Sequence, residues 1–171
     1  VCLGQDSLIW VNVTGQGVSR YEPVTDTFTK VSIGGLPDEW LTHVAGIGSY
    51  QGMSYFLHSQ GELVAASNGQ SVYRKRLAQN VKQHYFFTMN EKPFLALYGE
   101  EGGLSVYDLS NIEAPPQALI FSPFPISSIS TNNNGRELWI GTEAGQIYTA
   151  ALKDGKFEAT NMAPFFPQFS T

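Results

Sequence analysis

Residues 138–150, with the sequence LWIGTEAGQIYTA, define a pattern that recurs along the whole chain. The first three residues are of the bulky apolar kind that favours a β-strand. Gly141 and Gly145 flank a short turn that carries an acid, and glycine adopts the positive φ angles of tight turns at little cost. A second strand is expected directly after Gly145. The stretch therefore predicts a pair of strands joined by a tight turn.

The same order of strand, turn, glycine and strand occurs four times. The anchoring glycines are Gly17, Gly61, Gly103 and Gly145, so the intervals are 44, 42 and 42 residues. The strands expected before these glycines cover residues 8–13, 53–58, 94–98 and 138–140. The strands expected after them cover residues 18–21, 62–66, 104–107 and 146–150. A fixed period of this length is the signature of a repeat architecture.

Each unit also carries an outer strand and an inner strand. The outer strands contain Phe28, Val72, Leu119 and Phe157. The inner strands of units two to four cover residues 44–48, 85–88 and 126–130, while the first unit has only residues 1–6 in that place. Four strands in about 42 residues is the size of one β-propeller blade.

The sequence therefore predicts an all-β fold, a β-propeller of four-stranded antiparallel blades. About four blades of 42–44 residues are expected, at approximately 1–33, 41–77, 82–121 and 126–162, in one domain. A β-sandwich with coincidental spacing is the alternative, and four concordant glycines argue against it. No segment has a convincing helical period. Two architectures remain open: a compact four-blade ring, or part of a larger propeller, which we favour because an unclosed array exposes strand edges.

The composition supports a turn-rich β protein and excludes several partners. The chain is 42% hydrophobic, 13% aromatic and only 15% charged, with 17 glycines, which argues against disorder. A net charge of −5 disfavours nucleic acid and anionic membranes as partners. Cys2 is the only cysteine, so no internal disulfide can form. No apolar run approaches the roughly 20 residues that span a bilayer, so no membrane insertion is expected.

No catalytic, cofactor or metal motif is present, and the chain is not expected to be an enzyme. A polysaccharide hydrolase or lyase with an acid on the loop face is a lesser alternative. His43 and His84 lie 41 residues apart, near the start of two inner strands, where a metal or an acidic ligand could bridge them. No third ligand occurs at the matching place in the fourth blade. Two unconnected histidines, and no metal, are therefore expected.

A ligand site is expected on the face that carries the turns between second and third strands. Acids gather there beside aromatic rings, and a sugar can stack on a ring while its hydroxyls donate to carboxylates. The predicted ligand-binding residues are Trp40, Tyr98, Glu100, Glu101 and Glu143. The ligand is expected to be a neutral or cationic small molecule or oligosaccharide. Asp38 and Glu39 add to the three glutamates, so five carboxylates on that side would repel a polyanion.

The motifs resemble the two-component regulator propeller repeat. In that family a blade reads as a strand LWIGT, a glycine turn, a strand with a tyrosine, then a final aromatic strand. Residues 138–148 match closely, and residues 9–28 match nearly as well. The third blade keeps Gly103 and Tyr107 but has Ala96 in place of the tryptophan, and the second blade is weak.

The resemblance implies the periplasmic sensor region of a bacterial receptor, whose partners would include further propeller or receptor domains. The expected function is non-enzymatic sensing of a sugar or oligosaccharide. The alternative is a protein–protein interaction scaffold resembling WD-repeat propellers, which could be cytoplasmic, although the Trp-Asp dipeptide of such repeats is absent. Trp10 and Trp139 hold the same repeat position, so both are expected to be buried between blades, and Trp139→Ala is expected to cost about 3–5 kcal/mol.

Overall fold

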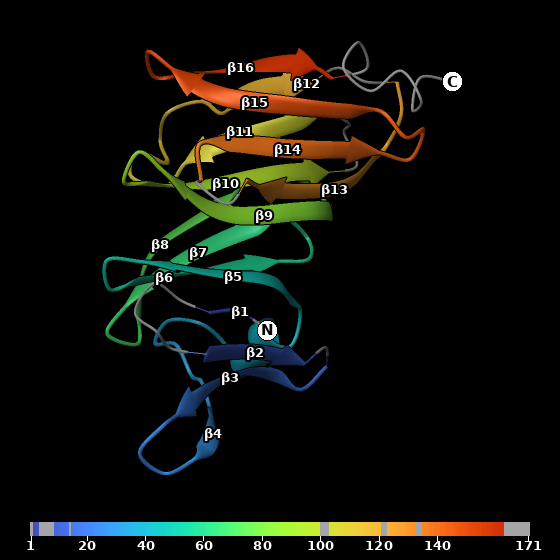
Figure 1. Ribbon diagram of the computed structural model, residues 1–171. Helices are drawn as coiled ribbons and strands as arrows, with labels where there is room; N and C mark the ends of the chain where they lie inside the picture. Colours follow the sequence, from blue (N-terminus) through green and yellow to red (C-terminus); the bar gives the residue numbers. More distant parts are fainter. Residues whose placement is uncertain are drawn as a thin grey trace. The chain divides into compact units, whose positions relative to one another are not determined.

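The computed structural model describes residues 2–3, 9–13, 15–99, 103–120, 123–132 and 135–162, with the backbone alone at 2–3 and 120. In this part of the chain, sixteen strands form four antiparallel four-stranded sheets (Figure 1). Within each sheet, strands that follow one another in sequence are hydrogen-bonded neighbours. The predicted all-β fold of four-stranded antiparallel blades is confirmed.

The strands of each blade are as follows. The first blade contains β1 (Cys2–Leu3), β2 (Ile9–Val13), β3 (Gly17–Glu22) and β4 (Thr27–Lys30). The second contains β5 (Val44–Tyr50), β6 (Met53–His58), β7 (Glu62–Ser67) and β8 (Gln70–Arg76). The third contains β9 (Val81–Met89), β10 (Lys92–Gly99), β11 (Leu104–Asp108) and β12 (Gln117–Ile120). The fourth contains β13 (Ile126–Thr131), β14 (Glu137–Thr142), β15 (Ile147–Lys153) and β16 (Lys156–Asn161).

The strand registers show which residues of the four blades are equivalent. The pairs Trp10↔Arg20, Tyr55↔Ala65, Ala96↔Val106 and Trp139↔Thr149 each span ten residues and join the second and third strands of a blade. The shared repeat position of Trp10 and Trp139 is therefore confirmed, as is the replacement of the tryptophan by Ala96. The same position in the second blade belongs to Tyr55.

The anchoring glycines fall on two adjacent positions rather than on one. All four have positive φ, at 100° for Gly17, 81° for Gly61 and 77° for both Gly103 and Gly145. Gly17 is paired with Val13 as the first residue of β3. Gly61 and Gly145 lie one place earlier, and each donates its N–H to the residue that ends the preceding strand, at 2.8 and 3.0 Å. Gly17 and Gly103 thus share one position of the repeat, and Gly61 and Gly145 share the position before it. The prediction that all four share one position is correct only within each pair.

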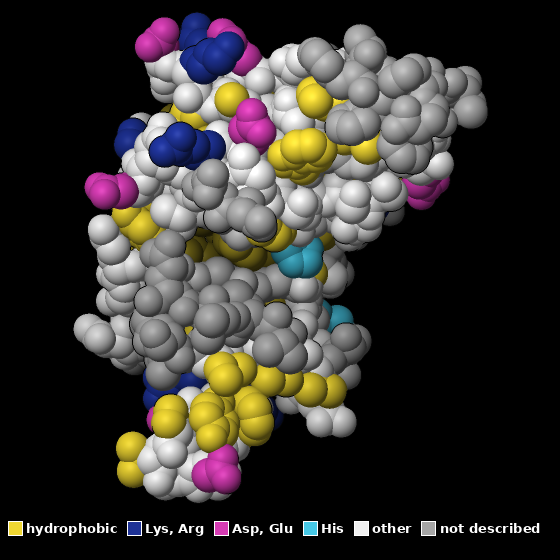
Figure 2. Space-filling view, viewed as in Figure 1, with side chains coloured by type: hydrophobic (Ala, Val, Ile, Leu, Met, Phe, Trp, Pro, Cys, Tyr) yellow, Lys and Arg dark blue, Asp and Glu magenta, His cyan; other side chains and the backbone are white. Residues whose placement is uncertain are grey.

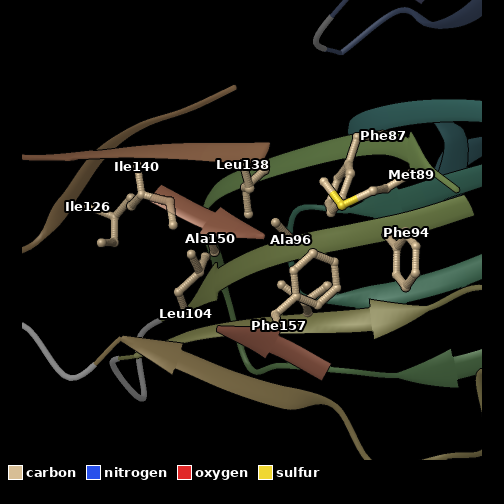
Figure 3. Close-up of a cluster of buried hydrophobic side chains, with 11 residues drawn as sticks. Phe87, Met89, Phe94, Ala96, Leu104, Ile126, Leu138, Ile140, Ala150 and Phe157 are labelled. Atoms are coloured by element: carbon tan, nitrogen blue, oxygen red, sulfur yellow. The ribbon is translucent and has the colours of Figure 1, made fainter. Parts of the chain in front are cut away.

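The chain divides into two compact units, Val1–Val81 and Lys82–Thr171, each with two blades and its own core. In the second unit, side chains from the third and fourth blades interdigitate, among them Phe94, Leu138 and Phe157 (Figure 3). In the first unit, Trp10 meets Phe56 edge to face, with ring centroids 5.7 Å apart. These contacts bury the apolar faces of paired blades, which stabilises each unit.

One short helix, α1 (Asp38–Leu41), lies between the first and second blades, where the sequence predicted no helix. Pro37 precedes it, and Asp38 and Glu39 occupy its first turn, where acids complement the helix dipole. A single turn of four residues is too short to show a helical period in the sequence. It carries Trp40 and Leu41 into the core of the first unit.

Large exposed apolar side chains are concentrated in the first blade. Val13, Val24 and Phe28 are 42%, 98% and 56% exposed. In the space-filling view, hydrophobic side chains gather over this part of the chain (Figure 2). Phe28 packs against Tyr21 at a centroid distance of 5.3 Å. Scattered apolar side chains are normal on a surface, but a cluster of them can mark an interaction site.

Candidate functional site

Trp40, one of the predicted ligand-binding residues, is buried. Its side chain is 9% exposed and belongs to the core of the first unit. Its indole Nε1–H donates to Oε2 of Glu62 at 2.7 Å. Arg74 donates to both carboxylate oxygens of Glu62, at 2.6 and 2.9 Å, and this pairing lowers the pKa of Glu62. The ring of Trp40 is therefore engaged with the protein rather than open to a stacking ligand.

Two histidines extend this cluster. The ring of His58 lies 5.0 Å from that of Trp40, and the ring of His43 lies 5.7 Å from His58. His58 is 8% exposed, and its Nδ1 accepts the backbone N–H of Gln60 at 3.1 Å. Burial, together with the charge of His43, lowers the pKa of His58. The structure thus places His43 beside His58, a residue in which the sequence showed no signal.

We expect the free energy of unfolding to fall as the pH drops below about 6.5, the usual pKa of histidine. The folded-state pKa of His58 is lowered, so only the unfolded chain takes up this proton as the pH first falls. Burial lowers the pKa of His84 in the same direction. Urea unfolding at about pH 7.5 and 5.5 would measure the loss.

The matched variant is His58→Asn, whose amide oxygen can still accept the Gln60 N–H. It should make the free energy of unfolding less dependent on pH over this range. An unchanged pH dependence would show that His58 does not contribute. Of the charged neighbours of His58, Glu62 and Arg74 stay ionised over this range, because their pairing lowers the pKa of Glu62 and raises that of Arg74. The charge of His43 also acts on His58.

His43 and His84 are not at equivalent places. His43 lies just before β5, whereas His84 lies inside β9, where it contacts Phe86 at a centroid distance of 6.3 Å. Within the described ranges, no group of three or more His, Cys, Asp or Glu side chains is placed to hold a metal ion. None of the helices in those ranges is long and apolar enough to cross a membrane.

The remaining predicted ligand-binding residues belong to the second unit. Tyr98 lies in β10, half-buried against the core of that unit. Glu143 is exposed in the turn between β14 and β15, and its backbone N–H donates to the Pro125 carbonyl at 3.0 Å. Glu100 and Glu101 lie outside the described residues. The structure therefore supplies no assembled group of the five.

A concave site of the first unit lies between its two blades, and we call it the Trp10 pocket. Its volume is about 370 Å³, within the range usual for ligand sites. The apolar part of its wall is formed by Trp10, Ile33, Phe56 and Ala66. Its polar lining includes Arg20, Glu22, Lys30, Ser54 and Asn68. The pocket thus combines an apolar floor with a charged rim.

The register explains why charges line this pocket. Trp10, Arg20 and Thr29 form one row across the first blade, since Trp10 pairs with Arg20 and Arg20 pairs with Thr29. Arg20 donates through Nε and Nη2 to Oε1 of Glu22, at 2.8 and 2.5 Å. Glu22 is two residues further along the same strand, so both side chains face the pocket.

Sequence reasoning missed this site, although a signal was present. The residues equivalent to Arg20 are Ala65, Val106 and Thr149, all small or uncharged. A charge at one copy of a buried repeat position indicates an altered contact between blades. Arg20 lies within a strand rather than in a loop, so only a comparison of the four copies of this strand position distinguishes it.

No family model matches the sequence, and no curated protein matches it. Among solved structures, the chain is similar to the crystal structure of the WD40 domain from Toxoplasma gondii coronin, with a TM-score of 0.64 and 7% sequence identity. The likeness covers 93% of this chain and 43% of that one, so the chain spans less than half the length of the protein it matches. At this identity the likeness shows the fold alone, and that fold is a β-propeller.

Proposed function

We propose that the chain is a non-enzymatic protein-interaction scaffold, a propeller that binds a segment of a partner protein. The observation that carries the proposal is the Trp10 pocket, with its apolar floor and charged rim. Protein-recognition sites combine a buried apolar centre with a polar rim in this way. The likeness to a WD40 domain supports the proposal at the level of fold, which by itself assigns no function.

Sensing of an oligosaccharide is less well supported by the described residues. Trp40, expected to stack on a sugar, is buried and bonded to Glu62. The carboxylate of Glu62 is in turn paired with Arg74. Membership of the two-component regulator propeller group, a role in a sensor and a periplasmic location stay predictions that rest on the sequence motifs.

A binding screen separates the two functions. The protein would be labelled and applied to an array of peptides of varied composition and to an array of neutral and sulfated oligosaccharides. We expect a defined subset of peptides to bind and the oligosaccharides not to bind. Saturable binding of neutral oligosaccharides, with no peptide bound, would overturn the proposal and favour the sensing function.

A further inference from the structure

The second unit contains the counterpart of the Trp10 pocket, and there the space is largely filled. It lies between the third and fourth blades and is lined by Val106 and Asp108, the equivalents of Arg20 and Glu22. Its volume is about 140 Å³, against about 370 Å³ in the first unit. The two pockets therefore differ by more than twofold at the same place in the repeat.

Phe157 fills the counterpart. Its side chain is 8% exposed, and its ring meets that of Phe94 edge to face at 5.2 Å and that of Phe87 at 6.1 Å (Figure 3). The residue reaches this place because it is the second residue of β16, the outer strand of a long hairpin. It pairs with Leu152, beyond which the turn lies at Asp154 and Gly155. An aromatic ring from within the chain thus completes the core between these blades.

The equivalent hairpin of the second blade is too short to do the same. Leu63 and Ile147 are equivalent residues, since their pairs Leu57↔Leu63 and Gly141↔Ile147 match. Counted from Leu63, β7 ends at Ser67; counted from Ile147, β15 ends at Lys153. The strand of the fourth blade is therefore two residues longer beyond the equivalent position. The turn at Asn68 and Gly69 therefore takes the place of the strand that carries Phe157, and among the described residues no ring from this hairpin lines the Trp10 pocket.

The charge of the pocket differs from that of the whole chain. Two cations, Arg20 and Lys30, line it against one carboxylate, Glu22, while the chain as a whole carries a net charge of −5. In the part of the chain that the structure describes, Lys30 forms no ion pair. Asp38 approaches from α1 and accepts a hydrogen bond from Ser32 at 3.2 Å, but it does not line the pocket. A locally positive rim favours an acidic partner.

We propose that the Trp10 pocket binds an aromatic side chain of a partner protein, presented beside an acidic residue, in the place that Phe157 takes within the second unit. The inference rests on the proposed function and specifies its ligand. The ring would pack on Trp10 and Phe56, while the acid would meet Lys30 at the rim. Aromatic anchors in desolvated pockets dominate many protein interfaces.

Three synthetic peptides of seven residues test the ligand. The first has a central phenylalanine between two glutamates, the second replaces the phenylalanine by alanine, and the third replaces the glutamates by lysines. By calorimetric titration, we expect the first to bind and each change to weaken binding at least about tenfold. Raising the salt concentration should weaken the first peptide further, because the rim charges are partly exposed.

Two variants test the pocket. Ser54 lines it and pairs with Ala66, so Ser54→Phe should place a ring in the pocket from within the chain and abolish binding of the first peptide. Lys30→Gln removes a rim charge without breaking the ion pair of Arg20, and should weaken binding about two- to fivefold. Lys156→Gln, an equal change of charge on exposed β16, is the matched control and should have no effect.

The outcomes distinguish this inference from the proposed function. Equal binding of the phenylalanine and alanine peptides, or full binding by Ser54→Phe with its circular dichroism unchanged, would overturn the aromatic anchor. Equal binding of the glutamate and lysine peptides would overturn the acidic flank. In each of these cases a peptide still binds and the scaffold function stands. Failure of every peptide on the array would instead overturn the function itself.

Discussion

Gly61→Ala is expected to lower the free energy of unfolding by about 2–5 kcal/mol. Gly61 has φ of 81°, which an alanine adopts only under strain. An ideal Cβ there would also lie 2.4 Å from the carbonyl oxygen of Ala78. That backbone cannot easily move away, because Leu77 and Ala78 both donate their N–H groups to the Gly61 carbonyl, at 2.8 and 3.2 Å.

Gly145→Ala is the matched control. Gly145 holds the same place in its blade and has φ of 77°, but nothing lies within 4 Å of an ideal Cβ. Only the backbone strain remains, so the expected cost is about 1 kcal/mol. Urea unfolding of both variants would separate strain from collision. Equal losses would mean that the close approach of Ala78 does not constrain the turn.

The strands could be predicted because their signal is local. Bulky apolar residues favour strands, and glycines recur at the tight turns, so a strand is predicted at residues 53–58 and β6 is observed at Met53–His58. The expected outer strand around Phe157 is likewise observed, as β16. A repeat strengthens such predictions, because four imperfect copies support one pattern.

The site could not be predicted because it depends on packing between elements. Trp40 was placed on an exposed face, but the turn of helix around it buries the ring against Glu62 and His58. The Trp10 pocket arises from the length of one hairpin, two residues shorter than its equivalent. Neither difference alters the local pattern of apolar residues, so neither is visible in the sequence of one strand.

Trp10 and Trp139 hold the same repeat position, yet their burial differs because it depends on packing against another blade. Both tryptophans were predicted to be buried between blades, and Trp10 confirms the prediction at 5% exposed. Trp139 is less buried than Trp10, at intermediate exposure, although its indole Nε1 is buried, so the prediction holds for this residue only in part. Trp10 points toward Phe56 of the next blade in its unit. Trp139 lies in the last described blade, where among the described residues no following blade provides such a partner.

Trp10→Ala is therefore expected to cost about 3–5 kcal/mol, because it removes a large buried side chain and its contact with Phe56. Trp10→Phe should cost less than Trp10→Ala, about 1–3 kcal/mol, because the smaller ring leaves a smaller cavity. A phenyl ring retains most of the apolar contact, and the Nε1 of Trp10 is buried without a hydrogen-bond partner in the described part of the chain, so its loss forfeits no hydrogen bond.

Trp139→Ala should cost only about 1–2 kcal/mol, less than the sequence indicated, because this side chain is more exposed than that of Trp10. Urea unfolding followed by circular dichroism would rank the three variants without relying on the fluorescence of the tryptophans they remove. A loss at Trp139 as large as that at Trp10 would contradict the expected order. It would mean that the indole of Trp139 is covered in solution by a further packing surface, as Phe56 covers that of Trp10.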